Sequence, residues 1–500
     1  MNINRRHFIF GSAAAMTLAG YSTNKIGARP LKPGEKRNLA MIGCGIMQRG
    51  LIKQFLDPNN APNVRIVAVC DCDKTRAAAY AEIVNKGYGD DKCRIVYDFQ
   101  EIVRDPSIDM VCIATPDHWH AYIAVEAMKH GKDVYCEKPL TYSVQETKEL
   151  IEAERKYGRI LQTGSMQRSW RGFRDAVSLV RGGLIGNVRY VDANFGIFNN
   201  KYGGPSQPVR FWDDPNNAAK EGAPNPDVDW VRWLGPAKMR PYSDQLAPRG
   251  THKDCPLFWR CDDDIASGYC GDWGAHHLDI AQWGLDMDKS GPYRVIRSDE
   301  PYSTNPVHGG RRQFGARMLF KKPYGDVELC HGPFSLTGAK YGWGTVFYGD
   351  NGIVAVNRGK IAVWVGTGLV KPTLEIRKQI EKCSFMADKI VASSIGKGKK
   401  LNRELDLLEK KYAGVIKSAG LYYSEQHVRN FCECVETRKL PIASAEVGGR
   451  ACTLCHVANM SYKHDVGFDW DPVKMEFANG TGHGISLMRP GDNNGWVVKA

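Results

Sequence analysis

Arg37-Asn-Leu-Ala-Met-Ile-Gly-Cys-Gly45 is a short apolar run that ends in two glycines one residue apart. The apolar part has the length of a buried strand, and the glycines allow a tight turn into a helix. From this point to residue 139, strand-like runs and helix-like runs alternate. The expected strands cover residues 38–42, 64–70, 94–97, 110–114 and 134–136. Such alternation predicts βαβ units and a parallel sheet, which binds ligands at the carboxyl ends of its strands.

The glycine turn matches part of the fingerprint of dinucleotide-binding proteins. Gly43 permits the tight turn, and Gly45 lets backbone N–H groups approach a pyrophosphate at the N-terminus of the helix. The third glycine of the fingerprint is replaced by Gln48, and Gly50 follows two residues later. This departure weakens the motif, because the third glycine allows close packing of helix and strand.

Asp71 ends the second expected strand. A carboxylate at this position accepts hydrogen bonds from a ribose diol and repels a 2′-phosphate, so it favours NAD as the cofactor. Lys74 and Arg76 lie close enough in the sequence to leave NADP open.

Lys138 lies in Asp133-Val-Tyr-Cys-Glu-Lys-Pro139, where a strand runs into a proline. Pro139 excludes its neighbour from the helical region, so Lys138 is expected to be extended at the carboxyl end of the strand. A lysine fixed there, beside the carboxylate of Glu137, has the position of a catalytic group. The alternative is a solvated surface lysine that precedes a turn.

The fourth strand ends in Thr115-Pro-Asp-His-Trp-His120, at the same edge of the sheet. This polar and aromatic loop is expected to close over the nicotinamide ribose. Capping of the following helix by Thr115 or Asp117 is the competing interpretation.

After residue 166 the pattern changes to that of an α+β domain. Strands are expected at residues 187–194, 316–320, 326–330, 346–349 and 361–364, and helices at 174–181, 424–437 and 445–462. They predict a large, mainly antiparallel open sheet, with one face available for substrate or association. Residues 378–418 are basic and helix-like, which predicts a surface insertion.

The segment Gly268-Tyr-Cys-Gly-Asp-Trp-Gly-Ala-His-His-Leu-Asp279 combines carboxylates and imidazoles at helical spacing. On a helix, Asp272 and His276 share one face, and Asp279 follows on the same side. A carboxylate beside an imidazole fixes its tautomer and raises its basicity, as a general base requires. A metal site and a structural cluster of ion pairs are the alternatives, although no fourth ligand or second motif completes a metal site.

Composition and charge argue against several other classes of protein. The chain has 500 residues, of which 43% are hydrophobic and 25% charged, as in ordinary soluble globular proteins. The net charge is +13, but the basic residues are scattered without interleaved aromatics, so no nucleic-acid partner is expected. No segment reaches the roughly 18 apolar residues of a transmembrane helix. The fifteen cysteines show no framework spacing and are expected to be buried free thiols.

The N-terminus has the layout of an export signal. Arg5 and Arg6 precede a small, apolar stretch at residues 11–20 that is too short to span a bilayer. We therefore expect export to the periplasm by the twin-arginine route, with residues 1–33 as signal and linker. A basic leader without this role is the alternative.

Together these residues resemble the Gfo/Idh/MocA family of nicotinamide-dependent oxidoreductases, in particular an exported branch. The shared elements are Gly43-x-Gly45, Asp71, Thr115-Pro116-x-x-x-His120, Glu137-Lys138-Pro139, Asp272-x-x-x-His276, Trp230-x-x-Trp233-Leu-Gly235-Pro236 and His427-x-x-Asn430-Phe431. The resemblance covers the chain from about residue 37 to the end. It implies an α/β protein with an NAD(P)-binding Rossmann domain (34–165), an α+β substrate and oligomerisation domain (166–465) and a C-terminal strap (466–500). It also implies a sugar or polyol substrate, and homodimers or homotetramers that form through the open sheet.

The motifs and the resemblance together give one set of expected site residues. Lys138, Asp272 and His276 are expected to be catalytic: His276 takes the hydroxyl proton, Lys138 stabilises the alkoxide, and Asp272 orients His276 or binds a neighbouring hydroxyl. The expected cofactor-binding residues are Gly43, Gly45, Ile46, Met47, Asp71, Thr115, Pro116, His120, Glu137, Lys138 and Gln167. No metal is expected.

The expected reaction is hydride transfer from a secondary hydroxyl of a sugar, glycoside or polyol to tightly bound NAD or NADP. Tight binding is expected because free nicotinamide cofactor is scarce outside the cytoplasm. The alternative is NAD-dependent glycoside cleavage, in which transient oxidation at C3 acidifies the C2 proton and allows elimination of the aglycone. A non-catalytic sugar sensor is a third interpretation, but such a protein needs no positioned base.

Overall fold

The structure, a computed structural model, describes residues 29–194, 221–248, 258–262, 264–268, 270–297, 316–331, 344–366, 388–391, 398–489 and 493–500. The expected twin-arginine motif lies outside these residues. Arg29 is held against the first half of the chain, since its guanidinium donates to Asp109 (2.7 Å) and to Glu35 (2.6 Å). Among the described residues, no helix combines the length and the apolar character needed to cross a membrane.

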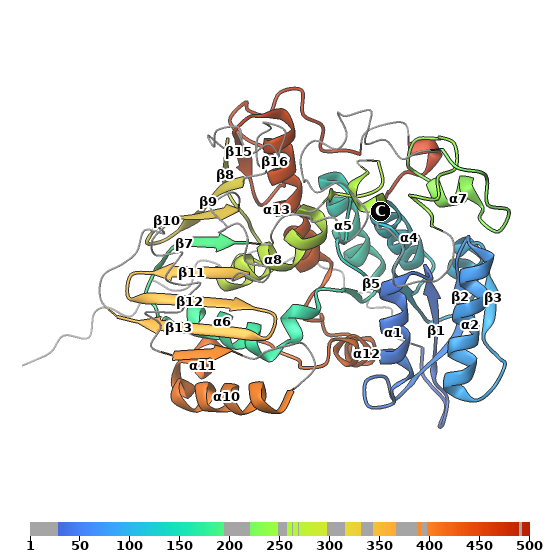
Figure 1. The fold of residues 1–500 in the computed structure, drawn as a ribbon, viewed down its shortest axis with the longest axis horizontal. Helices are drawn as coiled ribbons and strands as arrows, with labels where there is room; N and C mark the ends of the chain where they lie inside the picture. The colour runs from blue at the N-terminus through green and yellow to red at the C-terminus, as the bar shows by residue number, and fades with distance from the viewer. Residues whose placement is uncertain are drawn as a thin grey trace, which may run out of the picture.

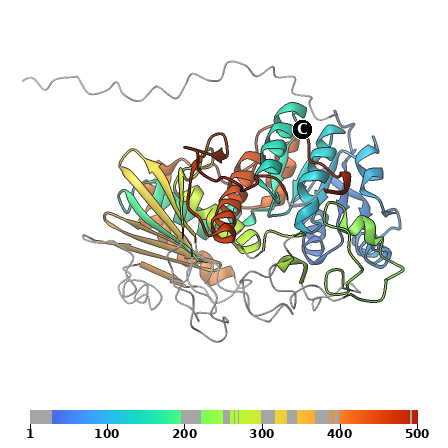
Figure 2. The ribbon, with the colours of Figure 1, turned by 90° about the horizontal axis from the view of Figure 1, so that it is seen from above.

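Six parallel strands form the first sheet, in the order β3-β2-β1-β4-β5-β6. They are β1 (Arg37–Ile42), β2 (Val64–Cys70), β3 (Arg94–Val96), β4 (Met110–Ile113), β5 (Asp133–Cys136) and β6 (Leu161–Thr163). The helices between them are α1 (Ile46–Leu56), α2 (Lys74–Tyr88), α3 (Phe99–Arg104) and α4 (Asp117–Lys129), and α5 (Val144–Tyr157) precedes β6. β4 and β5 are buried at every residue, as in a parallel sheet that helices cover on both faces (Figures 1 and 2). The predicted Rossmann fold is confirmed, and its strand order reverses between β1 and β4, where such sheets bind dinucleotides.

Gln48, which replaces the third glycine of the fingerprint, lies on α1 and is fully buried. Its amide Nε2 donates to the carbonyl oxygen of Cys112 in β4 at 3.3 Å, and the Cys112 Sγ lies 3.6 Å from its Oε1. The side chain therefore fills the space between α1 and the sheet. The larger residue is accommodated there without entering the ligand crevice.

The second sheet has ten strands, in the order β14-β13-β12-β11-β7-β10-β9-β8-β15-β16. They are β7 (Val188–Ala193), β8 (Arg294–Ile296), β9 (Ala316–Lys322), β10 (Gly325–His331), β11 (Thr345–Gly349), β12 (Gly352–Asn357), β13 (Lys360–Val365), β14 (Asp388–Val391), β15 (Phe468–Asp471) and β16 (Glu476–Phe477). Neighbouring strands are antiparallel except β7 and β10, which run parallel. The expected mainly antiparallel sheet is confirmed.

Five strands of this sheet are absent from the sequence prediction: β8, β12, β14, and β15 and β16 in the tail that is expected to be an extended strap. β12 is not among the expected strands, and five of its six residues are buried, so it lacks the alternation that marks a half-exposed strand. β14 falls in the basic segment that is expected to be helical, yet it pairs with β13 at the edge of the sheet. The later part of that segment does form helices, α10 (Gly398–Lys411) and α11 (Ala413–Ala419). Glu409 on α10 accepts from Arg171 at 2.7 Å, which holds α10 against α6 (Arg171–Arg181).

Helix α13 (Ala445–His464) joins the two halves of the molecule. It packs against α5 of the Rossmann half, against α8 (Ala275–Gly284), and against β8 and β9 of the second sheet. α6 and α8 in turn cover one face of that sheet (Figures 1 and 2). α8 is therefore held between the second sheet and α13, close to the carboxyl edge of the first sheet.

The C-terminal residues first extend the second sheet through β15 and β16 and then return to the Rossmann half. The Trp496 ring lies 5.0 Å from that of Trp119 on α4, and the backbone N–H of Ala500 donates to Glu149 on α5 at 2.9 Å. Figures 1 and 2 show the C-terminus beside α4 and α5, and Asn494 of the same tail donates to the carbonyl oxygen of Gly235, at the end of α7 (Trp230–Leu234), at 2.8 Å. The tail thus connects parts of the chain that are far apart in sequence.

Candidate active site

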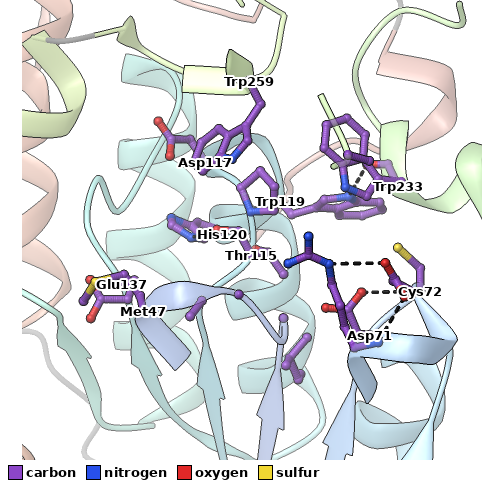
Figure 3. Close-up of a pocket in the computed structure, with 18 of the residues that line it drawn as sticks. Met47, Asp71, Cys72, Thr115, Asp117, Trp119, His120, Glu137, Trp233 and Trp259 are labelled. Atoms are coloured by element: carbon purple, nitrogen blue, oxygen red, sulfur yellow. Dashed lines mark hydrogen bonds and ion pairs between the residues drawn. The ribbon is translucent and has the colours of Figure 1, made fainter. Parts of the chain in front are cut away.

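A cavity of about 440 Å³ lies along the carboxyl edge of the Rossmann sheet. Figure 3 shows Asp71 and Cys72 on one side of this crevice and Glu137 and Met47 on the other, with Trp259 hanging opposite the sheet. Ten of the expected cofactor-binding residues line it: Gly43, Gly45, Ile46, Met47, Asp71, Thr115, Pro116, His120, Glu137 and Lys138. Of the expected catalytic residues, Lys138 and Asp272 also line it.

Two expected site residues do not line the cavity. Gln167 is 1% exposed in the 3₁₀ turn η1 (Met166–Ser169) and takes no part in the wall. His276 on α8 is 9% exposed and lies beside the cavity, with its ring 5.9 Å from that of the lining residue Trp273. The sequence therefore assigns both residues to the site, whereas in this structure neither belongs to the cavity wall.

The turn between β1 and α1 has the geometry that a bound dinucleotide needs. Gly43 has φ +88°, and a Cβ there would lie 2.7 Å from the backbone nitrogen of Thr115. A Cβ at Gly45 would meet nothing closer than 4.0 Å, so space remains above the start of α1. Ile46 and Met47 follow with 44% and 36% of their surface exposed, and both line the cavity. A ligand over this turn would cover apolar side chains and meet free backbone N–H groups.

Replacing Gly43 with alanine is expected to abolish dinucleotide binding and to destabilise the fold. The new methyl group would overlap the backbone of Ala114 and Thr115, just after β4, and the left-handed conformation at Gly43 disfavours any side chain. Quenching of tryptophan fluorescence by NADH measures the binding. Gly50→Ala is the matched control, because a Cβ at Gly50 meets nothing within 4 Å. Normal NADH affinity in Gly43→Ala would contradict this interpretation of the turn.

Asp71 is tied into the turn at the end of β2. Its carboxylate accepts from the backbone N–H groups of Cys44 (2.6 Å) and Asp73 (2.9 Å), while burial raises the pKa of Asp71. Arg76 donates to Asp73 at 3.2 Å and to the carbonyl oxygen of Pro248 at 2.6 Å. The acid is thus presented to the crevice on a rigid turn, and Arg76 is engaged by protein groups.

The expected loop at residues 115–120 is wrong for most of its length, because only Thr115 and Pro116 precede the helix and residues 117–120 form the first turn of α4. This first turn is fixed mainly by the His120 imidazole. His120 contacts the carbonyl oxygens of Pro139 (2.7 Å) and Thr115 (2.8 Å), one with each ring nitrogen. Burial lowers the pKa of His120 to about 4, although the two carbonyl contacts act in the opposite direction. Neither Thr115 nor Asp117 caps α4, so the capping interpretation is wrong. The buried Thr115 Oγ1 has no hydrogen-bond partner in the described part of the chain and lines the cavity, where a ligand can supply one.

Lys138 and Asp272 form the polar centre of the cavity. Lys138 follows β5, the peptide bond to Pro139 is cis, and Nζ donates to the Asp272 Oδ1 and, at 3.0 Å, to the Asp272 backbone carbonyl. Arg260 Nε donates to the other carboxylate oxygen of Asp272 at 3.2 Å. Burial opposes ionisation of Asp272, but Lys138 and Arg260 outweigh it and hold the pKa of Asp272 well below its usual range. The solvated-lysine interpretation is wrong, because the Lys138 side chain is only 11% exposed and is held by the Asp272 carboxylate.

Asp272 and His276 do not share a regular α-helix. Asp272 lies in a π-helical turn, η6 (Cys270–Gly274), which runs directly into α8. Burial lowers the pKa of His276 well below its usual range, and the nearby Lys138 and Arg358 add to this effect. The His276 Nδ1 is buried without a hydrogen-bond partner in the described residues. Asp272 acts in the opposite direction but does not outweigh these effects, so the expected rise in the basicity of His276 is not found: His276 is a neutral imidazole near Lys138 whose protonation is disfavoured.

Asp279, the last acidic residue of this segment, belongs to a separate ion-pair cluster. Arg168 in η1 donates to Asp279 at 2.7–3.0 Å and to Asp288 at 2.7 Å, and Arg168 and Asp279 are each 1% exposed. The structural alternative is thus confirmed for Asp279. Within the described chain, no group of three or more His, Cys, Asp or Glu side chains has the arrangement of a metal site.

Several residues of the cavity are absent from the expected site residues, above all Arg260; Asp117 belongs to the expected loop but is not among the expected site residues either. Burial raises the pKa of Asp117 to about 7, and that of Glu137 also to about 7. Two tryptophans, Trp233 and Trp259, complete the wall opposite the sheet (Figure 3). The sequence gives little indication of Arg260: it follows Trp259 and lies twelve residues before Asp272, but it belongs to no recognisable motif.

Comparison with known proteins places the chain in a family. Two family models match: the oxidoreductase family GFO_IDH_MocA, with an NAD-binding Rossmann fold, at residues 37–165, and the C-terminal α/β domain of this oxidoreductase family at residues 205–313. The scyllo-inositol 2-dehydrogenase (NAD(+)) of Bacillus subtilis (strain 168) is 32% identical over 152 residues, which cover 30% of this chain and 43% of that protein. The inositol 2-dehydrogenase of Salmonella typhimurium is 31% identical over 150 residues, covering 29% and 42%.

Solved structures show the same fold over most of the chain. The aldose-aldose oxidoreductase from Caulobacter crescentus, complexed with glycerol, has a TM-score of 0.52 at 17% identity and covers 87% of this chain and 100% of its own. Levoglucosan dehydrogenase in complex with NADH and levoglucosan has a TM-score of 0.53 at 16% identity, covering 87% and 99%.

The fold, the glycine turn and the family models agree, and the chain belongs to the Gfo/Idh/MocA family of oxidoreductases. It spans about half or less of the length of the curated relatives that it first matches.

Proposed function

We propose that this protein is an NAD-dependent oxidoreductase that oxidises a secondary hydroxyl of a sugar or polyol. The observation that carries the proposal is the Lys138–Asp272 ion pair, which lies in the same cavity as the glycine turn and Asp71. The residues present fit a dinucleotide, since the crevice offers an open helix N-terminus, an acid for the ribose and the unpaired Thr115 Oγ1. The inositol and levoglucosan dehydrogenases among the similar proteins support a polyhydroxylated substrate.

The side chains of the cavity divide the chemical work. A bound nicotinamide dinucleotide supplies the hydride acceptor. Lys138 donates a hydrogen bond to the substrate oxygen and stabilises negative charge there as the hydroxyl proton leaves. Asp272 holds the ammonium in place. His276 lies close to Lys138 and takes the hydroxyl proton, directly or through a water. Because burial and the nearby cations disfavour its protonation, His276 holds this proton only transiently before releasing it to solvent.

The turn after β2 supports NAD over NADP. Asp71 and Asp73 place two carboxyls where a 2′-phosphate would lie, and Arg76 is already bonded to Asp73 and to the Pro248 carbonyl. Repulsion between these carboxylates and the 2′-phosphate of NADP should make the affinity for NAD about 10²-fold or more higher than that for NADP.

The reaction is tested by incubating the protein with NAD+ and a panel of inositols, hexoses, anhydrosugars and aryl glycosides. The expected products are a keto sugar or keto polyol, which mass spectrometry detects, and NADH, which ultraviolet absorbance detects. Release of phenol from an aryl glycoside would instead indicate cleavage through transient oxidation. Failure to bind NAD+ or NADH at all would contradict the proposal.

The affinity for NAD+ is expected to rise with pH, by about fivefold between pH 6 and pH 8. Asp117 and Glu137 have pKa values raised by burial to about 7, and both line the cavity. The oxidised nicotinamide is positively charged, so it binds better when these carboxyls are ionised, whereas NADH gains nothing. Titration of tryptophan fluorescence at each pH measures this. The Asp117→Asn, Glu137→Gln double variant should show no pH dependence, and an equal rise for NADH would contradict the assignment.

We further propose export by the twin-arginine route, supported by Arg5, Arg6 and the apolar stretch that follows. Fusion of residues 1–40 to a reporter that is active only outside the cytoplasm tests it. Replacing both arginines with lysine should prevent export, and unchanged export of that variant would contradict the proposal.

A further inference from the structure

Part of the cavity wall comes from a segment outside the Rossmann domain. Residues 221–248, which contain α7, supply the lining residues Val228, Arg232, Trp233, Leu246, Ala247 and Pro248. Lining residues from the Rossmann half in the same cavity include Asp71, Cys72 and Asp73 from the end of β2, with Tyr97 and Phe99 from beyond β3. Figure 1 shows α7 above the carboxyl ends of β2 and β3, and Figure 3 shows Trp233 and Cys72 on the same side of the crevice. This is the end of the cleft where a Rossmann fold binds adenosine, because the acid after β2 contacts the adenosine ribose.

Backbone hydrogen bonds fasten this segment to the turn after β2. The N–H of Lys74 donates to the carbonyl oxygen of Asp227 at 2.9 Å, and the N–H of Asp229 donates to that of Cys72 at 3.0 Å. Between these two bonds, Asp73 and Val228 form an isolated antiparallel bridge. The segment is thus joined to the turn after β2 by backbone hydrogen bonds and lies across the opening of the crevice.

Two arginines add side-chain bonds across the same junction. Arg76 on α2 donates to the Pro248 carbonyl at 2.6 Å, at the other end of the segment. Arg232 on α7 pairs with Asp98 at 3.0 Å, at the start of α3. Both ends of the segment are therefore attached to the Rossmann domain on the adenosine side.

The C-terminal tail holds the segment from outside. The Asn494 side chain donates to the carbonyl oxygens of Gly235 (2.8 Å) and Ala237 (2.6 Å). Trp496 packs on Trp119, and Trp119 in turn donates through Nε1 to the Trp233 carbonyl at 3.1 Å. A Cβ at Gly235 would lie 2.0 Å from the Trp119 ring, so the segment and α4 are in close contact. Asn494 and Trp496 do not line the cavity themselves.

We propose that residues 221–248 form a clasp that closes the adenosine end of the cofactor cleft, and that the C-terminal tail holds the clasp shut. Release of the dinucleotide then requires the clasp to detach from the turn after β2. The cofactor is consequently retained over many turnovers, and its dissociation rate is set by Asn494 and Trp496, which are positioning residues. This inference rests on the proposed dinucleotide function.

Dissociation of NADH from the purified, folded protein tests the clasp. The protein is loaded with NADH and mixed with a large excess of NAD+, and the loss of energy transfer from tryptophan to NADH is followed by stopped flow. Asn494→Gly is the informative variant, because Asn494 has φ +49°, which glycine adopts without strain, and the change removes both hydrogen bonds. Dissociation is expected to be about tenfold faster than in the wild type, in line with the loss of two hydrogen bonds.

Asn479→Gly is the matched control. Asn479 lies on the same C-terminal tail with φ +52° and donates to Asp469 at 2.9 Å, but it is remote from the clasp. Its NADH dissociation rate should equal that of the wild type. Trp496→Leu should accelerate dissociation as Asn494→Gly does, and it decides the outcome if Asn494→Gly does not fold.

Equal dissociation rates in the wild type, the folded tail variants and the control would overturn the clasp while leaving the proposed function intact. Absence of any NADH binding by the wild-type protein would contradict the proposed function itself.

Discussion

Replacing Lys138 with methionine is expected to lower kcat by about 10²–10³-fold while NADH binding changes little. Methionine keeps the length of the side chain but removes the ammonium that faces the substrate oxygen. Asp272 would also lose the donor that fixes its Oδ1. Single-turnover reduction of NAD+, measured with the substrate identified from the panel, gives the rate of the chemical step.

The matched control for this variant is Lys129→Met. Lys129 lies on α4 and pairs with Glu126 at 3.0 Å, away from the cavity. Its kcat should be that of the wild type. If Lys138→Met keeps more than about a tenth of the wild-type kcat, Lys138 does not take part in the chemical step.

Replacing Arg168 with methionine is expected to lower the free energy of unfolding by about 3–5 kcal/mol. The guanidinium is 1% exposed and bonds both oxygens of Asp279 as well as Asp288, so its loss leaves the Asp279 carboxylate buried without its partner. Since Asp279 lies on α8, three residues after His276, the change should also disturb the site. The shift of the denaturant midpoint, followed by circular dichroism, measures the effect.

Arg294→Met provides the comparison for Arg168. Arg294 on β8 pairs with Asp469 on the neighbouring strand β15, where the arginine side chain is half exposed, and removal of Arg294 should not change the midpoint measurably. Equal midpoints for the Arg168 and Arg294 variants would show that the buried cluster contributes no more than a surface ion pair.

The Rossmann half is predictable from the sequence because its signals are local. Each strand, turn and helix from residue 37 to 139 is marked by its own residues, and parallel strand order brings their carboxyl ends to one edge. That is why the sequence alone assigns Gly43, Asp71, Thr115 and Lys138 to a common crevice. Gln48 shows the limit of this reasoning. The glycine motif shows that a larger residue replaces glycine there, but not that its side chain packs between α1 and the sheet, away from the ligand crevice.

The remaining walls of the cavity are not predictable in this way because they depend on contacts between distant segments. Arg260 and the clasp reach the crevice from beyond residue 220, and the tail that holds the clasp comes from beyond residue 490. No spacing rule connects residues so far apart along the chain. The π-helical turn at Asp272 likewise changes the angular relation to His276 that helical spacing predicts, and of these two residues only Asp272 lines the cavity.

A crystal structure of the protein with NAD+ and an identified polyol tests the central claim most directly. The account predicts adenosine beside Asp71 under the clasp, nicotinamide near Glu137, and a substrate hydroxyl within roughly 3 Å of the Lys138 Nζ. A dinucleotide bound in the reverse direction or outside this cavity, or a substrate hydroxyl out of reach of Lys138, would contradict it.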